Sequence, residues 1–362
     1  MVSSPTFGGN IQNSVNRVLG TVMAALYSVL VWLIFPNQPV GIFFCVVFFS
    51  IPMFYLQLHV RVARGMGSQS LAALYPILLA YYDVPYIENV YSTIYEVAYK
   101  RALAIVVGVI FALIVGRYVW PYLARTAIRR KLSRVLSDLG LAFSMLQSHF
   151  ESGTFVKFEG QTPLPPTPEE LLARQHETEQ MVETVKRMES DIEMMLTDCA
   201  DLHEDAMVEP RLKAPWPAAE YADLLMFTQD ILNHLTCLRV LLLRGVGSEL
   251  QEELVIPLKN VRRSVSGDMM LYFFIMSSVM ICKYSLPPKM PPVVRSVGRQ
   301  IIKVRKIVPK GTTSAESVQL ALFFAYNYNL LGMAEALENA GFKAAELFGR
   351  NYFVTDVDGL TS

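Results

Sequence analysis

The sequence predicts an all-α protein made of a multi-pass transmembrane bundle of about four helices and a cytosolic helical-bundle domain. Hydrophobic residues make up 52% of the chain and charged residues 18%, against about 25% charged in ordinary soluble domains. The deficit lies in residues 1–121, which hold six Lys or Arg and three Asp or Glu. After residue 121 apolar residues recur at spacings of three and four, which indicates helices.

Residues 1–121 are expected to form the transmembrane domain. Four apolar stretches approach the length of a membrane-crossing helix, at about 18–35, 40–58, 71–82 and 102–120. The second stretch is expected to break near Pro52. The third is short and carries Pro76, so we expect a tilted or broken helix there.

Two of these stretches open with a similar phrase, RVLGT at 17–21 and RALAI at 101–105. An arginine at the head of a membrane segment is costly, so Arg17 and Arg101 are candidate ligands for an organic anion. Gly20, Thr21 and Gly108 are candidates to line the same path. The alternative is that both arginines only anchor helix ends at the membrane surface, and that the small residues only allow close helix packing.

The charges flanking the spans predict the orientation of the chain. A basic run follows residue 120, and basic residues concentrate on the cytosolic side of membranes. With four spans, the N-terminus and the loop at 59–64 are then cytosolic, and the acidic loop at 83–99 faces the other side. The two similar segments therefore cross in opposite directions, as inverted repeats do in many transporters.

Residues 122–166 are expected to form a basic juxtamembrane helix and a proline-rich linker, and residues 167–362 the cytosolic helical domain. Further helices are predicted to begin at Pro168 and near Pro217, and to cover about 250–284 and 314–348. The stretch 269–282 is apolar throughout, but its 14 residues suit a buried core helix better than a membrane span.

No enzyme, metal or cofactor site is expected from the motifs. Cys199 and His203 are four residues apart and His234 and Cys237 three apart, which leaves zinc as an alternative, although the spacing matches no standard finger. The chain lacks a phosphate-binding loop and the common hydrolase motifs. Its formal net charge of zero disfavours nucleic acid as a partner.

Several short motifs resemble the fusaric acid resistance family of membrane transporters. The segments 4–9 and 17–21 resemble the middle of that family's membrane domain, and 101–121 its closing span. The segments 209–217 and 286–292 resemble a helical domain that follows the spans in fungal members, which are described as endoplasmic reticulum transporters or brefeldin A sensitivity-related proteins. The resemblance implies a transporter or efflux component for small organic anions or aromatic acids, in the endoplasmic reticulum or plasma membrane.

Family members have more spans than this chain shows, so we expect the C-terminal portion of a longer transporter. Its expected partners are the lipid bilayer, a small organic anion, and either further copies of the chain or a missing N-terminal half that would complete a pore. The alternative hypothesis is a non-transporting, membrane-anchored helical scaffold that recruits cytosolic partners.

Overall fold

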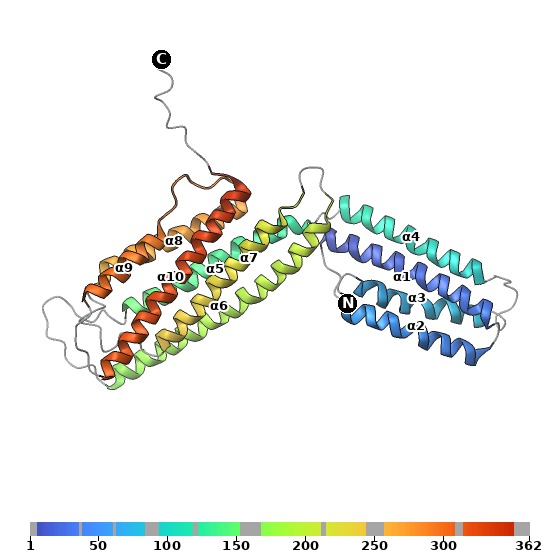
Figure 1. The fold of residues 1–362 in the computed structure, drawn as a ribbon, viewed down its shortest axis with the longest axis horizontal. Helices are drawn as coiled ribbons and strands as arrows, with labels where there is room; N and C mark the ends of the chain where they lie inside the picture. The colour runs from blue at the N-terminus through green and yellow to red at the C-terminus, as the bar shows by residue number, and fades with distance from the viewer. Residues whose placement is uncertain are drawn as a thin grey trace, which may run out of the picture. The chain divides into compact units, whose positions relative to one another are not determined.

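The structure is a computed structural model, and it confirms the all-α class for the residues that it describes. These are residues 6–35, 38–60, 63–83, 94–118, 122–152, 168–210, 215–243, 257–307 and 314–350. They form the helices α1 to α10, and no strand occurs among them (Figure 1). The chain divides into a first unit, residues 1–124 with 204–214, and a second unit, residues 125–203 with 215–362. The proline-rich linker lies outside the described residues.

The first unit contains the four N-terminal helices, α1 (Phe7–Ile34), α2 (Pro39–His59), α3 (Arg64–Asp83) and α4 (Ile94–Tyr118). Among the described residues, α1, α2 and the stretch 98–118 of α4 are long and apolar enough to cross a membrane. The helix α3 does not reach that hydropathy, although its 20 residues would extend about 30 Å. The structure thus gives α3 a fuller length than the short span expected at 71–82.

The expected breaks at the two prolines are absent, because α2 continues through Pro52 and α3 through Pro76. A proline removes one backbone hydrogen bond, and membrane helices tolerate that loss where neighbouring helices pack around them. The neighbourhood of Pro76 fits this condition, since Leu74, Ile77 and Leu78 are buried in the first unit.

Close packing of α1 against its neighbours holds the membrane bundle together. Gly20 lies so near α3 that an added Cβ would come within 2.8 Å of the Met66 carbonyl oxygen. On the α2 side, the Tyr27 ring stacks on Phe49 with centroids 4.4 Å apart. The Tyr27 hydroxyl also donates a hydrogen bond to the Cys45 carbonyl oxygen at 2.7 Å. Small residues and one aromatic pair therefore set the position of α1.

The start of α1 is tied to residues from much later in the chain. The backbone N–H of Phe7 donates to the Tyr122 carbonyl oxygen at 2.9 Å. The N–H of Ala124 donates to Glu209 Oε1 at 2.6 Å, and the Thr6 hydroxyl donates to Asp205. These bonds explain why residues 204–214 belong to the first unit, although sequence reasoning assigned them to the cytosolic domain.

The second unit is built mainly from the helices that follow, α5 (Ala124–Ser152), α6 (Pro168–Val208), α7 (Ala218–Leu243), α8 (Lys259–Cys282), α9 (Val293–Ile307) and α10 (Ser314–Phe348). The helix α6 begins at Pro168, and α10 ends before Gly349, whose φ of 78° favours glycine. Both boundaries confirm the sequence interpretation. The short helix α9 was not predicted.

The apolar helix α8 packs as a core helix on one side. It spans 24 residues, ten more than its apolar stretch, and by length and composition alone it could cross a membrane. However, Met269, Phe273 and Met276 are buried within the hydrophobic core of the second unit. That packing agrees with the core assignment made from the sequence.

Some of the buried polar groups in the second unit form pairs with one another. Gln147 Nε2 donates to the Tyr326 hydroxyl at 2.5 Å. Between α6 and α7, Arg239 Nε lies 2.9 Å from Glu189 Oε1, and their side chains are only 12% and 9% exposed. Because little water reaches this ion pair, each charge depends on the other for compensation.

We therefore expect Glu189→Gln to destabilise the second unit by about 3 kcal/mol, because it leaves the Arg239 cation buried without its counter-charge. The apparent melting temperature of the detergent-solubilised protein would measure the loss. Glu183→Gln is the matched control, since Glu183 pairs with Arg187 at the surface. Equal melting temperatures for the two variants would contradict the assignment.

The contact of Gly20 with α3 generates a second prediction. Gly20→Ala places a methyl group against the Met66 carbonyl, so the helices must separate, at a cost of about 1–3 kcal/mol. Gly108→Ala is the control, because a Cβ there meets nothing within 4 Å. We expect a lower melting temperature for the first variant and no loss for the second. A tolerated Gly20→Ala would show that α1 and α3 do not pack this closely.

Candidate functional site

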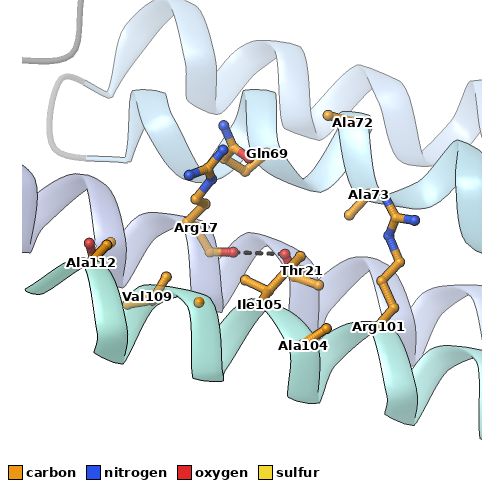
Figure 2. A pocket seen from close by; sticks show the side chains of 12 residues that line it. Arg17, Thr21, Gln69, Ala72, Ala73, Arg101, Ala104, Ile105, Val109 and Ala112 are labelled. Carbon is orange, nitrogen blue, oxygen red and sulfur yellow. Dashed lines mark hydrogen bonds between the residues drawn. The ribbon is translucent and has the colours of Figure 1, made fainter.

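A cavity of about 450 Å³ lies among α1, α3 and α4 in the membrane unit. That volume falls within the range of small-molecule sites. Figure 2 shows the side chains that line it. They are Ser14, Arg17 and Thr21 of α1, Gln69, Ala72 and Ala73 of α3, and Arg101, Ala104, Ile105, Gly108, Val109 and Ala112 of α4.

The cavity exists because small side chains face it from two helices. Ala72 and Ala73 on α3 and Ala104, Gly108 and Ala112 on α4 fill little of the space between the helix axes. The open space beside Gly108, where an added Cβ would meet no atom within 4 Å, shows the same effect. The walls therefore combine small apolar side chains with polar groups that give the cavity its chemistry.

Arg17 and Thr21 reach the cavity from one face of α1, because residues four apart lie on the same side of a helix. The Thr21 hydroxyl donates to the Arg17 carbonyl oxygen at 2.8 Å, so its proton is already engaged within the helix. In Figure 2 the Arg17 guanidinium points toward Gln69 of α3. Gln69 adds an amide to the site, and sequence reasoning had placed it outside the spans.

Arg101 enters the cavity from α4 and extends toward Ala73 of α3 (Figure 2). Its Nε atom is buried and has no hydrogen-bond partner. Among the described residues, neither Arg101 nor Arg17 forms an ion pair. The cavity lining contains no Asp or Glu. The site therefore offers two guanidinium cations and no acid from its own walls.

The helix boundaries place Arg17 and Arg101 further from the helix ends than the sequence analysis expected. The helix α1 begins ten residues before Arg17, and α4 begins seven residues before Arg101. The expected spans began at the residues just after these arginines. Arg17 and Arg101 therefore lie within their helices rather than in the first turn.

The cavity brings together four of the five residues predicted for the site, namely Arg17, Thr21, Arg101 and Gly108. The fifth, Gly20, does not line the cavity and is buried in the contact between α1 and α3. Its role is the close helix packing that the sequence left open as an alternative.

The residues proposed as an alternative zinc site are engaged elsewhere. His203 Nδ1 accepts a hydrogen bond from Trp216 Nε1 at 3.3 Å, and His234 Nδ1 lies 3.2 Å from Asn329 Oδ1. Cys199 is buried, and burial raises the pKa of its thiol to about 12. Within the described ranges, no three His, Cys, Asp or Glu residues are placed to hold a metal.

Comparisons with known proteins agree with the membrane unit and with the helices that follow it. The model of the Fusaric acid resistance protein family matches residues 1–206, and that of the Brefeldin A-sensitivity protein 4-like domain matches residues 124–330. The two matches overlap over α5 and most of α6. No individually curated protein matches the chain. Because the first match covers more than half of the sequence and includes every residue of the arginine-lined cavity, the chain belongs to the fusaric acid resistance protein family of membrane proteins.

Proposed function

We propose that the membrane unit binds small organic anions and serves as a transporter or efflux component for them, with Arg17 and Arg101 as the anion-binding residues. The observation that carries this proposal is the pair of guanidinium groups without acidic partners in one cavity among apolar helices. The family assignment supports a transporter-like role. The anionic substrate is inferred from the chemistry of the cavity.

The physical argument rests on the cost of an uncompensated charge. A cation inside the apolar part of a membrane is expensive, and such residues mark substrate or ion pathways by default. A carboxylate would relieve that cost, since it accepts two parallel hydrogen bonds from a guanidinium group. The alanine-rich walls would contact an apolar or aromatic body. Aromatic carboxylic acids therefore fit the cavity best.

The proposal also covers the side of the membrane on which the second unit lies and what a complete transport pathway needs. The basic residues that follow α4 favour a cytosolic location for the second unit. Each copy of the first unit supplies α1, α3 and α4 around one cavity. We therefore propose that a complete pathway also needs further copies of the chain or an N-terminal half.

Removal of either cation should weaken anion binding. For Arg17→Gln and Arg101→Gln we expect the affinity of the purified protein for an aromatic carboxylate to fall at least about 30-fold, because a charge-assisted pair with the carboxylate is lost. Equilibrium dialysis with a radiolabelled acid measures this. Cells that carry either variant should also lose protection against a toxic acid of the same class, at unchanged protein levels.

Arg117→Gln is the matched control for that prediction. Arg117 lies on α4 like Arg101, but its guanidinium sits 5.5 Å above the ring of Phe7 and does not line the cavity. We expect its affinity to stay near that of the wild type. If the two cavity variants bound the acid as tightly as this control, the anion-transport proposal would fail and the membrane-anchored scaffold would become the better hypothesis.

A further inference from the structure

The helix α8 has a second apolar face that its own unit does not cover. Whereas Met269 and Phe273 are buried in the core, Leu271, Phe274 and Ile281 are 50%, 70% and 59% exposed. Large exposed apolar side chains gathered on one helix face indicate contact with another molecule or with a membrane. The high hydropathy that makes α8 resemble a membrane span comes partly from these outward-facing residues.

The helix α5 runs beside this face. The Ser133 hydroxyl donates to the Ser277 carbonyl oxygen at 2.7 Å, and the Ser277 hydroxyl donates to the Ser133 carbonyl oxygen at 2.9 Å. On α5, Arg130 and Arg134 are exposed, three residues before and one residue after Ser133.

On α8, Phe274 and Ile281 flank the same contact, three residues before and four residues after Ser277. Exposed cations of α5 and exposed apolar side chains of α8 thus border one line of contact between the two helices. We call this surface the α5–α8 face, defined by Arg130, Arg134, Phe274, Ile281 and Lys283.

Basic residues outnumber acids around the α5–α8 face, where Asp138 lies one turn after Arg134 and interacts with it electrostatically. Residues 124–137 contain five Lys or Arg and no acid, and residues 269–315 contain eight Lys or Arg and no acid. These two segments meet where Lys283, just after α8, approaches the start of α5. The pKa of Lys283 is lowered by the Arg129 cation, and further by burial and by Arg125. Cations therefore crowd at this end of the unit.

We propose that the α5–α8 face rests on the anionic lipid surface of the membrane leaflet from which α5 emerges, with its apolar side chains in the interfacial region and its cations on the headgroups. Basic and apolar residues on one helical surface are the combination that binds such interfaces. The chain itself keeps the face near the bilayer. Arg125 is seven residues after Tyr118, which is the last residue of α4. A chain of seven residues can span at most about 25 Å.

Two native cysteines allow a direct test in the full chain. Cys282 is exposed at the end of α8, and Cys237 is exposed on α7. A polarity-sensitive dye would be attached to Cys282 in a Cys237→Ser variant, and to Cys237 in a Cys282→Ser variant as the control. Each labelled protein would be placed as a single copy in nanodiscs of phosphatidylcholine alone or mixed with phosphatidylserine.

We expect the dye on Cys282 to be quenched by nitroxide-labelled lipid and shielded from acrylamide in the phosphatidylserine discs. Both effects should weaken at high ionic strength, where the Debye length falls to about 3 Å. The dye on Cys237 should respond equally in both kinds of disc. Acrylamide is the aqueous quencher of choice, because it is uncharged and its local concentration does not depend on the lipid headgroups.

Charge removal on the face supplies the second measurement. Arg130→Gln/Arg134→Gln should weaken the association about 30-fold, which corresponds to about 1 kcal/mol for each cation near an anionic surface. Lys186→Gln/Arg187→Gln on α6 is the matched control, since it removes the same charge from another exposed surface of the unit. The control should behave as the wild type.

Two results would overturn the proposal. The first is acrylamide quenching at Cys282 that is the same in neutral and anionic discs and unaffected by Arg130→Gln/Arg134→Gln. The second is shielding of Cys282 that occurs in neutral detergent, rises with protein concentration and is absent from single-copy discs. That result would assign the face to contact between two copies of the chain. Neither result depends on anion binding in the cavity, so the two proposals can fail independently.

Discussion

A guanidinium cation keeps its charge at any physiological pH, so an apolar bundle that holds one must also supply a compensating group. Arg17 and Arg101 impose this requirement on the membrane unit twice, at one cavity. The walls supply the hydroxyls of Ser14 and Thr21 and the amide of Gln69, but no acid. We propose that the anionic substrate supplies the missing counter-charge, and that the helices of the membrane unit position the two guanidinium groups to bind it.

Small residues have two different roles in the membrane unit: some allow close contact between helices, and others leave space for the cavity. Gly20 lets α1 touch the backbone of α3, which fixes the distance between these helices. Ala104 and Gly108, on α4, leave space instead of closing it. The bonds from Phe7 to Tyr122 and from Ala124 to Glu209 then hold the start of α1 beside the chain that enters the second unit.

The sequence predicted the helical class, three of the membrane helices and four of the cavity residues, because hydropathy and helical spacing are local properties. It could not separate Gly20 from Gly108, since only the packing of α1 on α3 distinguishes a glycine in contact from one beside a cavity. The role of Gln69 was also hidden, because α3 begins earlier than its apolar stretch. Spacing along the chain also did not reveal that His203 contacts Trp216 and that His234 contacts Asn329.

The central claim is that an organic anion binds between α1, α3 and α4 at the two arginines. The most direct measurement is photo-crosslinking of the membrane-embedded protein with an azide-bearing aromatic carboxylate, followed by peptide mapping. The account predicts adducts on cavity-lining residues of α3 and α4, prevented by an excess of the unlabelled acid but not by its uncharged amide. Adducts confined to other parts of the chain, or equal competition by acid and amide, would contradict it.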